Sequence, residues 1–207
     1  MTGTRDRVDA TQVQAWVGRT YTGLADLLEA GGAGVWDAPT LCEEWRVRHL
    51  VAHVAMPVHL TPEQFGAEMA AAGGNFGVLS NRVATRDAAL PAAELLGALR
   101  SPVLHGWLPP GGGAAGALSH AVIHSLDATV PLGGPPVAPP EAVTAVLDLL
   151  TAADGAFFGL DLRGLRLEAA GTGWSWGDGE VVRADPGPLV SLVAARRLPD
   201  GRDLRRR

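Results

Sequence analysis

Apolar residues recur at helical spacing over most of the first 155 positions of this chain. They fall three and four residues apart over residues 13–28, and the glycine-rich stretch 31–34 follows as a stop signal. A second apolar stripe begins near Val47 and runs to Val54. Its continuation past Pro57 is open, because proline disfavours a helix interior. The pattern therefore predicts two helices before residue 60.

Three more stretches carry the same helical period. One lies within residues 76–100, where Pro91 is a break or a restart, and the others span about residues 114–130 and 140–153. The loop at 109–113, rich in proline and glycine, separates the first of these stretches from the second. These periods predict a mainly α fold in which residues 1–155 form a helical bundle.

The pattern changes after residue 155. Residues 165–169 alternate like a strand, 171–179 are typical of a turn, and 181–183 suit a second strand. Pro188 can open a short last helix. We therefore predict a small α+β appendage over residues 156–207, built as a hairpin plus a helix.

Length and composition narrow the class of protein. The chain has 207 residues, 47% of them apolar and 19% charged, which is typical of a globular fold of one domain with at most a small appendage. The net charge of −5 argues against a nucleic-acid partner. The basic stretch 196–207 is interpreted as a solvated, frayed tail. Residues 1–7 lead into no apolar signal segment, and no run is long enough to span a bilayer, so we expect a cytoplasmic protein without a membrane partner.

Two residue counts exclude specific chemistry. The chain has no lysine, which removes Schiff-base catalysis and the lysine of a phosphate-binding loop, and the glycine-rich residues 111–116 do not follow a strand. Cys42 is the single cysteine, so neither an intrachain disulfide nor a paired-cysteine metal site can form. Cys42 is either a reactive thiol or a small buried apolar residue, and the second interpretation is favoured.

The segment around residue 120 carries the clearest chemistry. His120 and His124 are four residues apart, and Asp127 follows three residues later. Positions i and i+4 share one face of a helix, so the two imidazoles could bind one metal ion. His53, on the apolar side of the earlier helix, is a third candidate ligand. Two helices presenting three imidazoles would form an open divalent-metal site.

Plainer interpretations remain for each of these residues. Histidines at i and i+4 also occur on solvated helix faces. Asp127 is either an acceptor that holds an imidazole N–H and orients the ring, or an exposed helical acid. His49 is expected to be exposed, and His59 and His105 have no partner at a useful spacing. The segment 174–179, rich in tryptophan and glycine, is either a binding surface or, as we favour, a tight turn.

Three segments together resemble a known family. Residues 38–53, APTLCEEWRVRHLVAH, resemble the N-terminal signature of mycothiol-dependent maleylpyruvate isomerase-like proteins, which belong to the DinB-like superfamily. His53 stands where that signature has a metal-ligand histidine. Residues 120–127, HAVIHSLD, are similar to the second family motif. Residues 165–168, LRLE, followed by residues 173–177, GWSWG, resemble the family's small C-terminal domain.

The resemblance implies a DinB-like four-helix bundle that holds one divalent ion through His53, His120 and His124. It also implies mycothiol as cosubstrate. The family usually has glutamate at the position of His120, and three neutral imidazoles would leave the ion its full +2 charge and make it a stronger Lewis acid. Imidazole-rich sites favour Zn²⁺, with nickel, cobalt and iron as alternatives.

Three functions follow as hypotheses. In the first, the ion favours the thiolate of a small-molecule thiol, which attacks an electrophilic substrate and leads to thiol transfer or cis–trans isomerisation. The alternatives are a metal-dependent hydrolase and a non-enzymatic, metal-binding stress-response protein. No arginine after residue 155 is assigned to a substrate carboxylate. The oligomeric state is left open, with a homodimer through an exposed bundle face as the one assembly considered.

Overall fold

The computed structural model describes residues 9–205. Residues 1–8, with the polar start discussed above, and Arg206 and Arg207 of the basic stretch lie outside the described residues. Helix α1 (Ala10–Ala30) begins where the Asp9 side chain accepts a hydrogen bond from the Thr11 N–H, and it buries an apolar stripe that includes Tyr21. The predicted first helix is confirmed.

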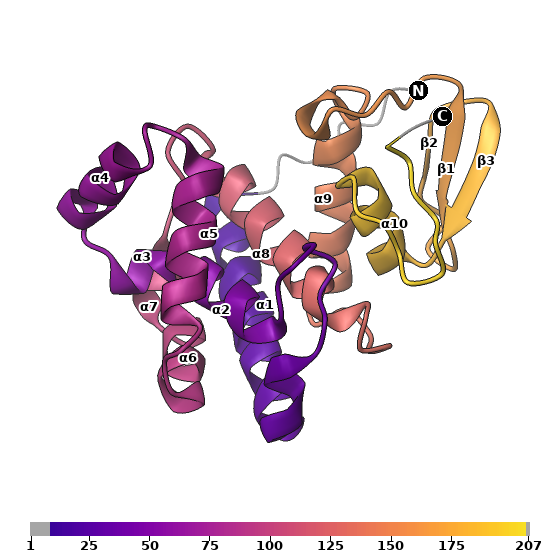
Figure 1. Cartoon of the computed structure of the whole chain (residues 1–207). Coiled ribbons are helices and arrows are strands. Elements are labelled where there is room, and N and C mark those ends of the chain that lie inside the picture. Colours follow the sequence, from indigo (N-terminus) through magenta and orange to yellow (C-terminus); the bar gives the residue numbers. More distant parts are fainter. Residues whose placement is uncertain (1–8, 206–207) are drawn as a thin grey trace.

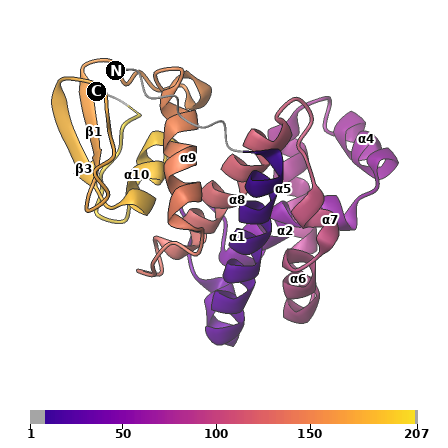
Figure 2. The same cartoon turned by 180° about the vertical axis from the view of Figure 1, so that it is seen from behind.

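Four helices form the bundle. Helix α8 (Gly113–Thr129) packs against α1 on one side and against α2 (Val47–Val54) on the other, and α2 packs against α5 (Phe76–Asp87). Figure 1 shows these helices together on one side of the molecule, and the view from behind in Figure 2 shows α1 beside α8. Leu50, Leu118 and Leu126 are fully buried at the helix contacts. The predicted mainly α fold and its four-helix bundle are confirmed.

Several shorter helices connect the bundle. Pro91 separates α5 from the next helix, as predicted, and Pro57 lies in the first turn of a short helix rather than ending all helical structure. The connecting helices are η1 (Ala33–Asp37), α3 (Met56–His59), α4 (Pro62–Ala71), α6 (Ala92–Leu99) and α7 (Pro102–Gly106).

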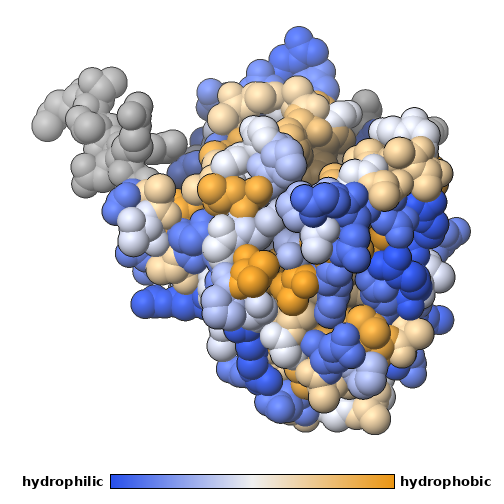
Figure 3. Space-filling model, turned by 90° about the vertical axis from the view of Figure 1, so that its left-hand side faces the viewer, coloured by the Kyte–Doolittle hydropathy of each residue, from blue (hydrophilic) through white to orange (hydrophobic). Residues whose placement is uncertain are grey.

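Helix α4 was not predicted, because none of its residues is fully buried and its large apolar residues are limited to Phe65 and Met69. The sequence feature that marks the start of α4 is a capping box, in which the side chains of Thr61 and Gln64 each accept a hydrogen bond from the other residue's backbone N–H. Phe65 and Met69 of α4 pack against a small cluster of Met56, Leu79 and Val83, separate from the main core. On this side of the molecule, apolar residues lie in separate patches among hydrophilic ones (Figure 3).

After the bundle, α9 (Pro140–Thr151) and η2 (Ala156–Phe158) lead to a sheet of β1 (Leu165–Ala169), β2 (Ser175–Trp176) and β3 (Glu180–Ala184). Helix α10 (Pro186–Val193) packs against α9 and the sheet. Figure 1 shows α9 and α10 between the bundle and the sheet. Helix α9 also packs against α8, and the main core contains buried residues from both parts of the chain. The division at residue 155 stays a prediction.

The predicted hairpin is wrong in its pairing. The two five-residue strands β1 and β3 are parallel, while β2, inside the predicted turn, pairs antiparallel with β1, which gives the order β2-β1-β3. Gly177 and Gly179 carry the chain closely past the start of β1. A Cβ atom at these positions would lie 2.3 Å from the Leu165 carbonyl oxygen and 2.1 Å from that of Gly164. Only glycine fits there, so the chain can cross to the other edge of β1.

The interpretation of residues 196–207 as a frayed tail is also wrong for the described residues up to 205. Leu198 and Leu204 are buried in the main core, at 4% and 7% exposure. Two leucines among the arginines are enough to anchor the segment, because burying each apolar side chain contributes roughly 1.5–3 kcal/mol. Within residues 9–205, no helix combines the length and apolar character needed to cross a membrane.

Candidate metal centre

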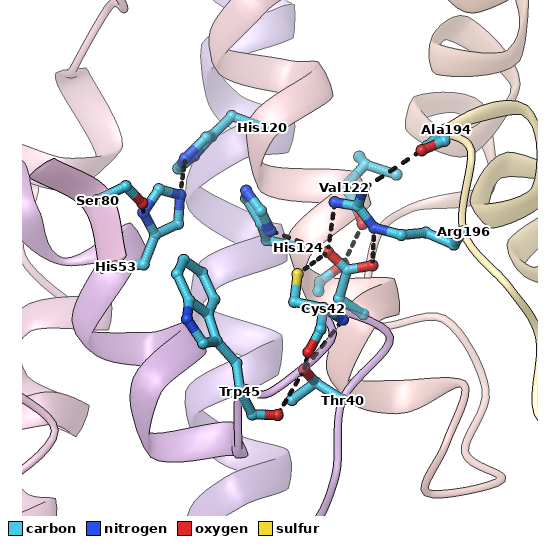
Figure 4. Close-up of polar contacts among 12 residues, drawn as sticks. Thr40, Cys42, Trp45, His53, Ser80, His120, Val122, His124, Ala194 and Arg196 are labelled. Carbon is cyan, nitrogen blue, oxygen red and sulfur yellow. Dashed lines mark hydrogen bonds and ion pairs between the residues drawn. The ribbon is translucent and has the colours of Figure 1, made fainter. Parts of the chain in front are cut away.

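Three imidazoles converge between α2 and α8. His53 comes from α2, and His120 and His124 come from successive turns of α8. One ring nitrogen from each lies within 4.8 Å of the others, and the Nε2 atoms of His53 and His120 are 3.4 Å apart. Figure 4 shows the three rings facing one another. The structure therefore brings together the three histidines singled out from the sequence.

The remaining nitrogen of each ring has a partner of its own. His53 Nδ1 lies 2.9 Å from Ser80 Oγ, and His120 Nδ1 lies 2.8 Å from the Tyr21 hydroxyl. His124 Nδ1 lies 3.0 Å from Asp127 Oδ2. With every Nδ1 engaged, each ring has its Nε2 left as the atom that a metal ion could use.

Burial keeps two of the rings neutral. Burial, followed by the proximity of His124, lowers the pKa of His53 to about 3. Burial, followed by the proximity of His124 and His53, also holds the pKa of His120 well below its usual range. Neutral imidazole is the form that binds metal ions. These donors therefore fit a divalent transition-metal ion such as Zn²⁺, which prefers nitrogen ligands.

Asp127 is fully buried rather than exposed. Its Oδ2 accepts from His124 Nδ1 at 3.0 Å and from Cys42 Sγ at 3.1 Å. The Arg196 guanidinium donates to both carboxylate oxygens, with Nε–Oδ1 at 2.9 Å and Nη2–Oδ2 at 3.1 Å. Burial alone would raise the pKa of Asp127, but the His124 hydrogen bond and the Arg196 charge lower it to about 2. Asp127 is therefore a carboxylate that holds an imidazole N–H.

Cys42 lies in the loop between η1 and α2. The Thr40 side chain accepts from the Cys42 N–H, and the Leu41 N–H donates to the Asp127 carbonyl at 2.9 Å, which ties the loop to α8. Cys42 is only half-buried, so the favoured interpretation as a buried apolar residue is incomplete. Burial, and then the Asp127 charge, raise the pKa of its thiol. Cys42 therefore stays a thiol that donates to Asp127.

A pocket of about 510 Å³ opens onto the imidazoles. This volume lies within the range of roughly 300–1,000 Å³ usual for small-molecule sites. His53 and His124 contribute to its wall, beside Trp45, whose ring centroid is 5.1 Å from that of His53. Its lining also contains Arg196, Arg197 and Arg205, from the segment that follows α10. Residues of the bundle and of the C-terminal segment thus form one pocket.

The other histidines lie outside this cluster. His49 is half-buried, where we expected it to be exposed, and its Nδ1 accepts from the Arg46 N–H at the start of α2. His105 Nε2 donates to the Leu99 carbonyl at 2.8 Å. His59 lines a separate hollow beside α4. In the predicted turn after β1, the Trp174 indole donates to Asp148 of α9.

Three residues of the site were not identified from the sequence. In the sequence pattern, Tyr21 is one more apolar position in the stripe of α1. Ser80 belongs to no periodic pattern, so nothing marks it as a partner of a histidine. Arg196 was assigned to a solvated tail. A buried carboxylate needs a cationic partner. If Asp127 had been recognised as buried, it would have pointed to an arginine elsewhere in the chain.

A comparison with protein families supports this reading of the sequence. Residues 17–104 match the model of the family described as mycothiol maleylpyruvate isomerase N-terminal domain. The family resemblance is confirmed. The matched region contains Tyr21, Cys42, His53 and Ser80, while His120 and His124 lie beyond it.

The fold of the whole chain has a counterpart among solved structures. A crystal structure of a histidine-to-alanine mutant of mycothiol-dependent maleylpyruvate isomerase is similar over 97% of each chain, with a TM-score of 0.60 and 13% identity. A second structure of that enzyme is similar with a TM-score of 0.49 and 16% identity, also over 97% of each chain. At 13% identity the likeness to the mutant structure shows the fold alone. No curated protein matches this chain.

Proposed function

We propose that this protein is a divalent-metal-dependent enzyme that uses a low-molecular-weight thiol to transform an electrophilic small molecule. The thiol is mycothiol, and the outcome is thiol transfer or cis–trans isomerisation. One observation carries the proposal: three imidazoles have their Nδ1 atoms engaged and offer ring nitrogens within 4.8 Å of one another, and two of them, His53 and His124, line a ligand-sized pocket. The family match of residues 17–104 supports mycothiol as the thiol.

His53, His120 and His124 would hold the ion, and Zn²⁺ suits them best, with nickel, cobalt and iron as alternatives. A divalent ion bound by three neutral imidazoles keeps its full charge, leaves a coordination position open and lowers the pKa of a thiol that reaches it. Asp127 accepts the His124 Nδ1–H and so directs the other ring nitrogen toward the pocket. Arg196 balances the charge of that carboxylate.

The pocket residues would position the two small molecules. Trp45 is fixed by the hydrogen bond from its indole to Asn81 at 2.9 Å, and with Phe76 it gives the pocket an apolar side. For isomerisation, the thiol sulfur adds to one carbon of the substrate double bond and the resulting single bond rotates. The sulfur then leaves with its electron pair, so the thiol is regenerated and the substrate differs only in configuration. If the carbon that received the electron pair of the double bond instead takes up a proton, the sulfur stays bound and the reaction is thiol transfer.

The hydrolase alternative needs a general base near the ion. Asp127 is the carboxylate closest to the imidazoles in the described chain, and both of its oxygens already accept hydrogen bonds from Arg196. A carboxylate engaged in this way is poorly placed to take a proton from water. This geometry favours the thiol reaction over hydrolysis.

The deciding experiment measures metal content by elemental mass spectrometry and then mycothiol-dependent isomerisation of a cis-configured electrophile such as maleylpyruvate. We expect about one equivalent of a divalent ion in the wild type and its loss in His124→Ala. His49→Ala, on α2 but outside the cluster, is the matched control and should keep the ion. A wild type that remains empty when zinc is supplied would refute the metal site. Metal binding without turnover of any electrophile in the presence of mycothiol would refute the enzyme.

A further inference from the structure

Two buried hydroxyls contact the imidazoles from helices that supply no candidate ligand. Tyr21, on α1, is 1% exposed, and its hydroxyl lies 2.8 Å from His120 Nδ1. Ser80, on α5, is 6% exposed, and its Oγ lies 2.9 Å from His53 Nδ1. Figure 4 shows Ser80 beside His53, on the side of the ring away from His124. Each hydroxyl thus contacts a single imidazole.

The Tyr21 hydroxyl is held in place by its surroundings. The Tyr21 ring lies nearly parallel to the His105 ring, with an interplanar angle of 8° and centroids 6.4 Å apart. His105 is itself fixed, because its Nε2 donates to the Leu99 carbonyl and Gly18 leaves room for its ring. A Cβ atom at residue 18 would lie 3.3 Å from His105 Nδ1. The phenol therefore has little freedom to turn away from His120.

We propose that Tyr21 and Ser80 are positioning residues that fix the tautomer and ring orientation of His120 and His53, so that both Nε2 atoms face the metal position. The inference rests on the proposed metal site. An imidazole that offers Nε2 to a cation carries its proton on Nδ1, and a hydroxyl oxygen accepts that proton's hydrogen bond. Together with Asp127, the two hydroxyls give every candidate ligand its own acceptor.

The chemical character of the acceptors adds a second consequence. Tyr21 and Ser80 are neutral, and the charge of Asp127 is balanced by Arg196. The three acceptors with Arg196 therefore bring no net charge to the site. An ion held there would keep more of its power to polarise a ligand than one surrounded by uncompensated carboxylates.

The test compares zinc affinity in wild type, Tyr21→Phe and Ser80→Ala by competition with a zinc-binding indicator. Each variant should bind zinc about 10- to 100-fold more weakly, the loss typical when such an acceptor is removed. Thr151→Val is the matched control. Thr151 is 2% exposed on α9 and donates to the Leu147 carbonyl at 2.8 Å, so this change also removes a buried hydroxyl. It should leave zinc affinity unchanged.

A spectroscopic measurement separates positioning from a general loss of packing. In zinc-loaded protein with ¹⁵N-labelled histidines, the His120 and His53 Nδ1–H protons should both be visible and protected from exchange. Tyr21→Phe should lose protection at His120 alone, and Ser80→Ala at His53 alone. Since each variant reports on its own ring, one that fails to fold leaves the other as the test.

The possible results separate the two proposals. If wild type and variants bind zinc equally and both Nδ1–H protons stay protected, the positioning role is overturned and the metal site stands. Loss of both signals in either variant would also overturn it, because a packing defect would then explain the effect. A wild type that binds no zinc overturns the proposed function, and the positioning role with it.

Discussion

The two sides of His124 are stabilised by different means. On one side, His53 and His120 contact neutral hydroxyls of α5 and α1, so this half of the site is built from helices packed within the bundle. On the other side, Asp127 is a buried charge whose counter-charge, Arg196, comes from the segment after α10. A neutral buried group needs only a hydrogen bond, whereas a buried charge also needs an opposite charge. The charged side should therefore be the more sensitive to substitution.

The largest effect is expected for Asp127→Asn, which leaves the Arg196 guanidinium without its counter-charge. Breaking a buried ion pair from one side typically costs about 3–5 kcal/mol. Urea denaturation should show that loss in the free energy of unfolding. The double variant Asp127→Asn with Arg196→Gln should cost less than the sum of the single changes. If Asp127→Asn stays within about 1 kcal/mol of wild type, the charged side is not the sensitive one.

A smaller loss is expected for Leu204→Ala, which tests whether the segment after α10 is anchored. Leu204 is 7% exposed in the main core, and truncating a buried leucine costs about 2–5 kcal/mol, with the low end expected because the side chain keeps some exposure. Leu149→Ala is the matched control, because Leu149 is 42% exposed. That change should shift the free energy of unfolding by less than about 0.5 kcal/mol. Equal losses in the free energy of unfolding for the two variants would show that the segment is not anchored and would support the original prediction of a frayed tail.

Cys42→Ala removes one donor from Asp127 while leaving Arg196 in place. We expect a loss of about 1 kcal/mol in the free energy of unfolding, with Cys42→Ser nearer to wild type. In wild type, the raised pKa of the thiol should make alkylation of Cys42 slow compared with the unfolded chain. Asp127→Asn should speed alkylation, because the carboxylate no longer opposes the thiolate. Rapid alkylation of folded wild type would contradict the assigned protonation state.

The smallest effect is expected for Arg205→Gln at the rim of the charged side. Arg205 Nη1 lies 3.2 Å from Glu43 Oε1, both residues line the pocket, and both side chains are exposed, at 40% and 80%. Exposed ion pairs contribute about 0–1 kcal/mol, and salt screens them. The free energy of unfolding should change by less than about 0.5 kcal/mol, and by less still at high salt. A larger loss in the free energy of unfolding would show that the Arg205–Glu43 ion pair belongs to the sensitive, charged side of the site.

The sequence predicted the residues that lie close together along one helix, but not those that packing brings in from other segments. The spacing of His120, His124 and Asp127 is a local property of one helix, so the sequence alone places them on one face. His53 could be added through the apolar stripe of its own helix and the family resemblance. Tyr21 and Ser80 could not, because a hydroxyl becomes a partner only through the packing of α1 and α5 against the histidine helices. Arg196 could not either, since its contact spans 69 positions.

The fold shows the same limit. The strand over residues 165–169 was predicted with its observed bounds, because alternation is local. Its partners were wrong, because the choice between antiparallel and parallel pairing depends on the crossing at Gly177 and Gly179. Helix α4 was missed since it buries none of its residues. Periodicity detects an element through a repeated apolar face, so it gives a weak signal where that face has only two large apolar residues.

The long separation between Asp127 and Arg196 has a consequence for biosynthesis. Arg196 is made 69 residues after Asp127, which at roughly 5–20 residues per second is a delay of about 3 to 14 s. During that interval the histidines are already synthesised, but the Asp127 carboxylate has no guanidinium to pair with. Because burying an unpaired charge is unfavourable, the carboxylate is more stable hydrated. The histidines are therefore synthesised before Arg196, the partner of the Asp127 carboxylate. Closure of the charged side of the pocket can follow only after the C-terminal segment has emerged.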